Sequence, residues 1–205
     1  MTDSLQTNRS QSVDELVRLV RTSRDAFGQL FDCFYPPIFA YCLRRLLVRA
    51  AAEDVTSEVF LKAATGIHAF SGTSGEEFRR WLFRIATNEI SAELRNSIRR
   101  RELLEEAARM GTIKADVSTS LLHEDAVIEW QSAYEALGEL SDREQSLISL
   151  RFFAGLRHHE IAEVLELKEG TVRVALSRAL EKLRGRLQGS VTVRRTSSGM
   201  EGGDQ

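Results

Sequence analysis

The chain is poor in the residues that cross-link or interrupt a fold. Among its 205 residues only two are cysteines and two are prolines. Cys33 and Cys42 are too few for a disulfide scaffold, and their spacing fits a pair of reduced, buried thiols. The prolines are adjacent, at Pro36 and Pro37, and long alternating runs of β-branched residues are absent. Helix-forming residues dominate the rest, so the sequence predicts an all-α protein.

Several function classes lack their sequence signals. No apolar run is long enough to span a membrane, and residues 1–14 are polar, without the apolar core of a secretion signal. We therefore expect a cytoplasmic protein with no membrane contact. Glycine loops that cradle phosphates are missing, and so is any HExxH pattern. His158 and His159 are adjacent on a predicted helix and point in different directions. We expect no enzyme activity, no cofactor and no bound metal.

Charge is small overall but strongly segregated along the chain. The net charge is −2. Residues 79–101 hold arginines at 79, 80, 84, 95, 99, 100 and 101 against Glu89 and Glu93. Residues 102–129 are acidic, and residues 168–195 are again basic. Two basic segments separated by an acidic one suggest two nucleic-acid contacts joined by a linker. Solvated helix faces are the alternative explanation.

Residues 141–187 have the pattern of a helix-turn-helix. Ser141 followed by Glu144 is a capping box, and Leu147, Ile148, Leu150 and Phe152 continue the helix as an apolar stripe. Ala154 and Gly155 end it. A short second helix follows, and a third begins near Gly170, with leucines at helical spacing on one face. Its other face carries Arg173, Ser177, Arg178, Lys182 and Arg184, left for solvent or phosphate. Such a helix suits the DNA major groove, although an amphipathic helix of any three-helix bundle would look similar.

The N-terminal half predicts four helices. The first is expected from near Val13 into residues 30–34, with Phe27, Leu30, Phe31 and Phe34 in its core. Pro36 and Pro37 should end it, with Pro37 in the first turn of the next helix. A third helix should span about 52–68 and place Asp54, Ser57 and Glu58 together on the face opposite its apolar residues. A Gly/Ser loop at 71–75 precedes a fourth helix, from about 76 to beyond 101.

The start of the fourth helix interleaves aromatic residues with arginines. Residues 78–86 read FRRWLFRIA. Rings that stack on unpaired bases and guanidinium groups that hold the backbone are what single-stranded DNA binding needs. Trp81 could equally be structural, and Leu82 and Ile85 could belong to the core. The loop at 71–77 could form the wall of a base pocket or simply connect two helices.

Five segments together carry a family resemblance. They are AEDVTSEVFLKA at 52–63, FRRWLFRIATN at 78–88, LSDRE at 140–144, EIAEVL at 160–165 and GTVR at 170–173. In this order, over about residues 20–188, the chain resembles bacterial RNA polymerase sigma factors of the extracytoplasmic-function group. The resemblance implies two small helical domains joined by a flexible linker, the second a helix-turn-helix.

The resemblance also implies a role for each segment. Residues facing the clamp helices of the polymerase β′ subunit would be Asp54, Ser57 and Glu58. Residues on or near minus-ten promoter DNA would be Phe78, Arg80, Trp81, Arg84, Asn88, Arg95, Arg99, Arg100 and Arg101. Residues reading the minus-thirty-five element would be Lys168, Thr171, Arg173, Val174, Ser177 and Arg178. The second domain would also touch the β flap, and an inhibitory anti-sigma factor is an expected partner.

The chain departs from the family pattern at several positions. Ser57 stands where glutamine is common, and Ala92 where an aspartate is usual. Thr87 stands where a cation is common. Arg157 occupies the usual serine cap of the second helix of the helix-turn-helix, and Glu166 stands in its turn where glycine is usual. Val174-Ala175 replaces a polar-basic pair. These departures bear on the promoter sequence rather than on the class.

The implied organisation has five parts. Residues 1–12 are expected to be disordered, 13–104 to form the domain that binds polymerase and the minus-ten element, and 105–127 to be an acidic linker. Residues 128–188 should form the helix-turn-helix domain, opening with a helix at about 124–137, and 189–205 a disordered tail. Two other functions fit parts of the pattern: an autonomous helix-turn-helix regulator, and an adaptor that binds only protein.

Overall fold

A computed structural model describes residues 13–109 and 137–197, with the side chains of 104, 105, 107–109 and 187–197 left out. All regular structure in these ranges is helical, with no strand among them. The predicted all-α class with two helical domains is therefore confirmed. The chain divides into two compact units, which are described separately. Four predicted features fall outside the described residues. They are the disorder of residues 1–12, most of the linker, nearly all of the helix at 124–137 and the end of the tail.

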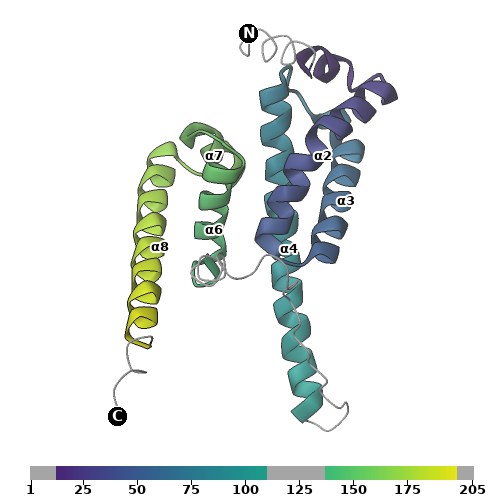
Figure 1. The fold of residues 1–205 in the computed structure, drawn as a ribbon. Coiled ribbons are helices and arrows are strands. Elements are labelled where there is room, and N and C mark those ends of the chain that lie inside the picture. The colour runs from purple at the N-terminus through teal and green to yellow at the C-terminus, as the bar shows by residue number, and fades with distance from the viewer. Residues whose placement is uncertain (1–12, 110–136, 198–205) are drawn as a thin grey trace, which may run out of the picture. The chain divides into compact units, whose positions relative to one another are not determined.

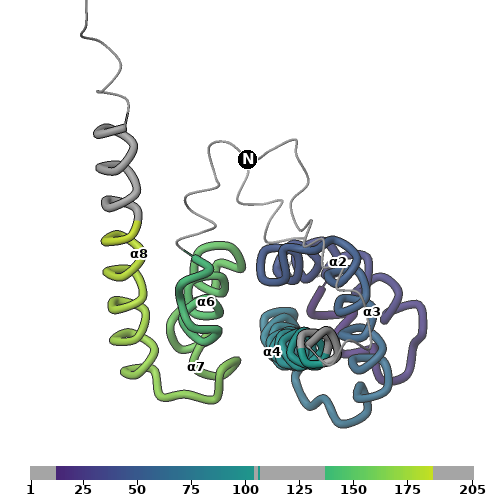
Figure 2. The backbone as a smooth tube through the Cα atoms, turned by 90° about the horizontal axis from the view of Figure 1, so that it is seen from below, coloured from purple at the N-terminus to yellow at the C-terminus, as the bar shows by residue number. Residues whose placement is uncertain are grey.

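The first unit is a bundle built around three long helices. Residues 13–19 are helical, and α2 (Arg24–Leu46), α3 (Arg49–Gly66), the 3-10 turn η1 (Ile67–Ala69) and α4 (Gly75–Arg109) follow. Helices α2, α3 and α4 pack against one another in pairs (Figure 1). Figure 2 shows α4 nearly end-on beside the other two. The largest fully buried side chains of this core include Leu30, Ile38, Tyr41, Phe78, Leu82 and Phe83.

The first helix break lies before the prolines, not at them. The chain leaves the helix at residues 20–23, and Ser23 caps α2 by accepting a hydrogen bond from the Ala26 N–H at 3.2 Å. Helix α2 then runs through Pro36 and Pro37, so the predicted end there was wrong. A proline inside a helix costs about 3 kcal/mol. The fully buried Leu30 and Ile38 flank the prolines on α2, and the burial of such side chains offsets this cost.

The continuous α2 also changes which side chains are buried. Of the four residues expected in the core, Leu30 is fully buried, whereas Phe31 is 36% exposed and rests edge-on against Phe60. Cys42 is buried and Cys33 is exposed, which corrects the expected buried pair. Nine residues on one helix correspond to about two and a half turns, so the two thiols face opposite sides. Desolvation raises the pKa of the Cys42 thiol to about 11.

The second unit contains the helix-turn-helix. Helix α6 (Asp142–Ile148) passes into the π-helical turn η3 (Ser149–Phe153), and α7 (His158–Leu165) and α8 (Glu169–Ser197) follow. Helices α6 and α8 pack together. The core of this unit holds Leu147, Leu150, Leu156, Ile161, Val172 and Leu176. Gly155 has a φ of 68° and ends the first helix as predicted.

Three details of the helices differ from expectation. Phe152 does not continue the buried stripe: it is 56% exposed, because the wider π turn shifts the residues after Leu150 around the helix. Helix α4 continues to Arg109, into the range expected for the linker. Residues 102–109 are ELLEEAAR, all good helix formers. Helix α8 continues to Ser197, past the residue where the disordered tail was expected to begin.

Candidate nucleic-acid and polymerase interfaces

One face of α3 is polar and exposed. The helix buries Ala52, Val55, Val59 and Ala63, so its opposite side presents Asp54 and Ser57 to solvent, with Glu58 about half exposed. The Ser57 hydroxyl donates to the Glu53 carbonyl at 2.9 Å, which leaves its oxygen free to accept. The three residues predicted for polymerase binding therefore do lie together. We call Asp54, Ser57 and Glu58 the α3 face.

A lysine joins this face to α4. Lys62 lies 3.7 Å from the Glu58 carboxylate and 2.7 Å from that of Glu89 on α4. The hydrogen bond to Glu89 is the main cause of a raised pKa at Lys62. Because the shorter bond goes to Glu89, Lys62 neutralises Glu58 only in part. The α3 face therefore keeps an acidic character suited to a basic partner.

The aromatic residues at the start of α4 divide between core and surface. Phe78 is 1% exposed, and its ring packs on Phe34, Phe70 and Trp81 at centroid distances of 5.4, 5.5 and 5.7 Å. Phe78 is therefore a core residue, which corrects its expected place on DNA: the packing on three sides leaves no surface for a base. Trp81 is half-buried, with its ring 4.9 Å from that of Phe70 and tilted by 31°.

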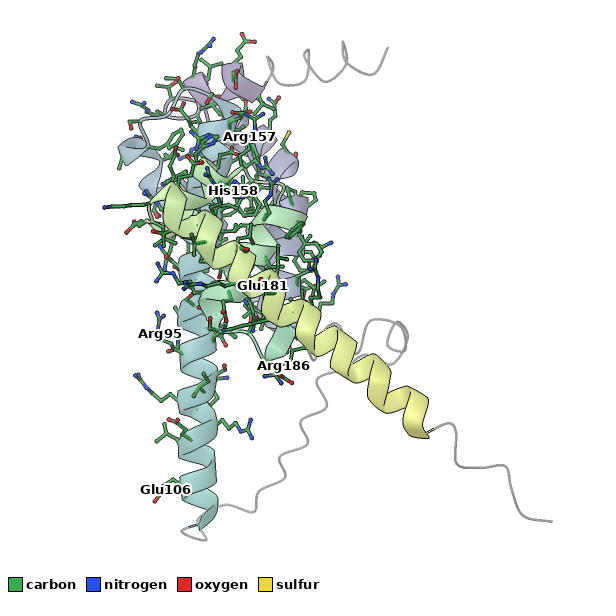
Figure 3. The ribbon with its side chains drawn as sticks, turned by 90° about the vertical axis from the view of Figure 1, so that its left-hand side faces the viewer. Arg95, Glu106, Arg157, His158, Glu181 and Arg186 are labelled. Carbon is green, nitrogen blue, oxygen red and sulfur yellow. The ribbon has the colours of Figure 1, made fainter. Side chains whose placement is uncertain are left out.

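The remaining polar residues of α4 form a stripe. Trp81, Arg84, Asn88, Arg95 and Arg99 recur at spacings of three, four and seven, which place them within about 60° of one another around a helix. All but Trp81 are exposed, and Arg95 is seen on the C-terminal half of α4 in Figure 3. We call these five residues the α4 stripe. It runs for roughly 27 Å along the helix.

The other arginines predicted for minus-ten DNA lie off the stripe or at its edge. Arg100 and Arg101 are exposed but project from other sides of α4. Arg80 is half-buried at the opposite edge of the stripe from Trp81. The structure thus brings together five of the predicted residues, and leaves Arg100 and Arg101 as exposed charge nearby.

The threonine that replaces a common cation in the family is buried. Thr87 donates its hydroxyl to the Phe83 carbonyl at 2.8 Å, so it accepts from the Tyr41 hydroxyl, 3.0 Å away. The Tyr41 ring also packs edge-on against Phe83 at 5.3 Å. This hydrogen-bonded pair lies in the core between α2 and α4. A cation at position 87 would have to be buried there, at a large desolvation cost.

The loop before α4 is held by hydrogen bonds. Glu77 accepts from the backbone N–H groups of Thr73 at 2.8 Å and Ser74 at 3.1 Å. In return the Ser74 hydroxyl accepts from the Glu77 N–H at 3.3 Å. The hydrogen bonds that the carboxylate accepts, first that from the Thr73 N–H and then that from the Ser74 hydroxyl at 2.9 Å, lower the pKa of the Glu77 carboxyl. The Ser-x-x-Glu spacing at 74–77 is the usual sequence signal of such a capping box, so this role of Glu77 was predictable.

The residues predicted to read the minus-thirty-five element lie on the outer side of α8, with Lys168 in the turn just before it. Lys168, Thr171, Arg173, Val174, Ser177 and Arg178 are all exposed, whereas Val172, Leu176 and Ala179 are buried. Helical geometry places Val174, Ser177 and Arg178 at the centre of the outer face, with Thr171 and Arg173 on its two flanks. We call these five residues the α8 face. Arg173 forms an ion pair with Glu169 at 3.1 Å.

The capping box at the start of α6 is confirmed and also fixes α8. Glu144 accepts from the Ser141 N–H and hydroxyl, both at 2.9 Å, and from Lys182 on α8 at 2.5 Å. These bonds, that of Lys182 first, lower the pKa of the Glu144 carboxyl to about 2. Lys182, expected to face solvent or phosphate, therefore holds two helices together. Arg186 similarly pairs with Glu139 at 2.5 Å (Figure 3).

Two departures from the family pattern have visible consequences at α7. Glu160 supplies the reciprocal half of a capping box: it is buried, and its carboxylate accepts from the N–H of Arg157, the residue at the cap position, at 2.7 Å. This role was not predicted, although a glutamate three residues after the cap is its usual sequence signal. In the turn after α7, Glu166 has a φ of 54°. This left-handed conformation favours glycine and costs another residue about 1 kcal/mol.

Within the described residues, no group of three or more His, Cys, Asp or Glu side chains is placed to hold a metal ion. His159 is exposed and His158 is half-buried. No helix in the described ranges is both long and apolar enough to cross a membrane.

Comparison with known proteins agrees with this arrangement. The chain matches the family models for sigma-70 region 2, at residues 30–101, and sigma-70 region 4, at residues 136–185. It is 32% identical over 162 residues to the ECF RNA polymerase sigma factor BldN of Streptomyces coelicolor, covering 78% of this chain and 59% of BldN. It is 30% identical over 173 residues to the ECF sigma factor SigW of Bacillus subtilis, covering 80% of this chain and 90% of SigW.

Solved structures share the fold. The sigma factor RpoE, crystallised with the anti-sigma factor NepR from Bartonella quintana, matches with a TM-score of 0.62 and 23% identity, over 81% of this chain and 98% of that one. CnrH in complex with the cytosolic domain of CnrY matches with the same TM-score and identity, over 86% and 97%. With both regions present in order, the chain belongs to the extracytoplasmic-function group of RNA polymerase sigma factors, promoter-specific factors for transcription initiation.

Proposed function

We propose that the three surfaces divide the work of initiation. The α3 face binds core RNA polymerase, the α4 stripe holds the opened minus-ten element, and the α8 face reads the minus-thirty-five element. The observation that carries this assignment is the α4 stripe: a half-buried tryptophan continues directly into exposed arginines on one side of a single helix. Trp81 also packs on Phe70, but the four polar residues of the row are exposed and lie outside the core of the bundle.

The stripe suits unpaired DNA for a physical reason. Taking a base out of the duplex costs a few kcal/mol. A ring that stacks on the exposed base returns about 1–3 kcal/mol. Trp81 supplies the ring, and Arg84, Arg95 and Arg99 supply charges for the phosphates. The stripe is long enough for several nucleotides of one strand.

The α8 face suits the major groove. Arg178 at its centre can donate two hydrogen bonds to a guanine, and the exposed Val174 side chain can contact a thymine methyl. Thr171 and Arg173 at the flanks are placed for phosphates or neighbouring bases. The departure at Val174 from a polar residue therefore points to a thymine-containing site rather than to loss of recognition.

With these three roles, the protein catalyses no reaction itself. It needs no cofactor or metal, and its place of action is the cytoplasm, where polymerase and promoters meet. We further propose that an anti-sigma factor controls it, since a sigma factor of the same fold has been crystallised with the anti-sigma factor NepR, and CnrH, also of this fold, has been solved in complex with the cytosolic domain of CnrY. Such a partner would cover one or more of the three surfaces.

Reconstituted transcription tests the function. Bacterial core polymerase would be incubated with fragmented genomic DNA of the host, with and without the chain. Discrete transcripts that depend on the chain are the expected result. A folded chain that neither binds core polymerase nor yields transcripts would contradict the proposal. An autonomous regulator would then show tight DNA binding alone, and a protein adaptor would show no salt-sensitive DNA binding.

A further inference from the structure

A contact from before α2 reaches the start of α4. Helical residues 13–19 place Asp14 so that its Oδ1 accepts a hydrogen bond from the Gly75 N–H at 2.6 Å. The two residues are 61 positions apart, and the bond is partly buried. Val13 packs on the same glycine: a Cβ added to Gly75 would lie 2.6 Å from Val13 Cγ1. The first turn of α4 is thus tied to the N-terminal helix by a bond and by a close packing contact.

The bond completes the capping of the loop that leads into α4. Glu77 already accepts from the N–H groups of Thr73 and Ser74. Asp14 takes the next N–H, that of Gly75, and brings its carboxylate from a different element. Two carboxylates therefore satisfy three successive backbone donors at a helix N-terminus, where negative charge is favoured.

The same loop rests on the aromatic residues of the α4 stripe. A Cβ on Gly72 would lie 2.4 Å from Phe70 Cζ, so the backbone of the loop lies directly on that ring. The Phe70 ring in turn packs against Trp81 at 4.9 Å. A displacement of the loop would move Phe70, and Trp81 would lose the surface that fixes its ring. The contact at Gly75 is therefore linked by packing to the ring that meets DNA.

We propose that Asp14 and Val13 are positioning residues for the minus-ten site. They hold the loop at 71–75 and the first turn of α4 so that Trp81 and Arg84 receive unstacked bases without rearrangement. This inference rests on the proposed function of the α4 stripe. Its physical basis is preorganisation. If the site had to become ordered on binding, the free-energy cost of that ordering would add to the cost of unstacking the bases.

The test measures each activity of the holoenzyme separately. Binding to a single-stranded oligonucleotide carrying the non-template minus-ten sequence of a promoter used by the wild type would be followed by fluorescence anisotropy. Asp14→Ala should weaken this binding roughly tenfold, since it removes a hydrogen bond to a charged acceptor. Affinity for core polymerase and for a minus-thirty-five duplex should not change. Asp14→Asn keeps an acceptor and should restore most of the binding.

Matched variants distinguish a positioning role from a general loss of folding. Glu15→Ala, an exposed residue on the same helix, should have no effect. Gly75→Ala should mimic Asp14→Ala because the new Cβ meets Val13 Cγ1. Val13→Ala in addition should recover binding, because the new methyl group at position 75 fills the space that the Val13 Cγ1 leaves and meets the Val13 Cβ at an ordinary 3.4 Å. Normal oligonucleotide binding by Asp14→Ala, or equal losses of core and oligonucleotide binding, would overturn the inference, as would failure of the double variant to recover.

Trp81→Ala in the same assay separates the two proposals. If it leaves oligonucleotide binding intact, the function assigned to the α4 stripe fails. If Trp81→Ala weakens binding and Asp14→Ala does not, the stripe keeps its function and only the positioning role is lost.

Discussion

At the scale of single residues, the surroundings of each side chain decide between core and interface. Phe78 and Trp81 are three residues apart in one aromatic run, yet Phe78 is enclosed by rings from α2 and from the segment before α4, whereas Trp81 keeps part of its surface. Alternation of ring and arginine indicated a site that meets DNA. This alternation could not show which of the two rings is buried, because the rings that enclose Phe78 come from residues distant in sequence.

Loss of the Trp81 ring should impair promoter opening. Trp81→Ala removes the stacking surface. The fraction of open complexes should therefore fall at least about tenfold, because stacking contributes about 1–3 kcal/mol per base. Trp81→Phe keeps a ring and should recover much of the opening. Permanganate footprinting measures the melted bases, and core binding by gel filtration is the control. Normal footprints with Trp81→Ala would show that the ring is structural.

Arg173 should contribute to minus-thirty-five recognition. A contact to a base or phosphate is worth about 1–3 kcal/mol, so Arg173→Ala should lower the affinity for the cognate duplex about tenfold. Glu169→Gln removes its ion pair but keeps the guanidinium, and should bind as tightly as the wild type or more tightly. Electrophoretic mobility shifts with the holoenzyme measure both. Equal affinities for Arg173→Ala and the wild type would show that Arg173 does not contribute to binding of the minus-thirty-five element.

The Glu144 carboxylate should make stability depend on pH. Its pKa is about 2 in the folded chain, below the ordinary value of 4.5 that applies when the chain unfolds. Its stabilising effect is therefore complete above about pH 4.5 and is lost as the pH falls towards 2. Glu144→Gln should lower the melting temperature at pH 7 and have little effect near pH 2.

Calorimetry at the two pH values checks this, with Glu181→Gln as the control. Glu181 is an exposed carboxylate on the same helix as Lys182 (Figure 3), and its replacement should change neither melting temperature. A deficit of Glu144→Gln that is as large at pH 2 as at pH 7 would contradict the role of its charge.

At the scale of elements, local signals were readable and long-range contacts were not. The capping box of Ser141 and Glu144 and the stop at Gly155 depend on neighbours in sequence, and both are present. The course of α2 through Pro36 and Pro37 depends on packing against α3 and α4, which overrides the local preference. The bond between Asp14 and Gly75 joins residues 61 positions apart, so no pattern along the chain could indicate it.

A single substitution in the turn of the helix-turn-helix should increase the stability of the protein. Glu166→Gly removes a side chain from a left-handed conformation and should stabilise the second unit by roughly 0.5–1 kcal/mol. Glu181→Gly, within α8, should instead destabilise it by about the same amount, since glycine is unfavourable inside a helix. Urea unfolding measures both changes. A destabilised Glu166→Gly variant would mean that the glutamate side chain has a structural role that outweighs the strain.

At the scale of the whole molecule, the two surfaces proposed to bind DNA, the α4 stripe and the α8 face, lie on separate units of a chain with a net charge of −2. Two modest sites bind tightly together only when something sets their spacing, which raises the effective concentration of the second site after the first has bound. Core polymerase is the partner that would do so in this family.

The affinity of promoter duplex for the chain alone, for core polymerase alone and for the two together tests this most directly. The duplex would be a promoter identified by reconstituted transcription, at fixed salt. Tight, sequence-specific binding by the mixture, with weak binding by each component, is the predicted result. If the chain alone bound the promoter as tightly as the mixture, it would be an autonomous regulator, and the division of work among the three surfaces would be wrong.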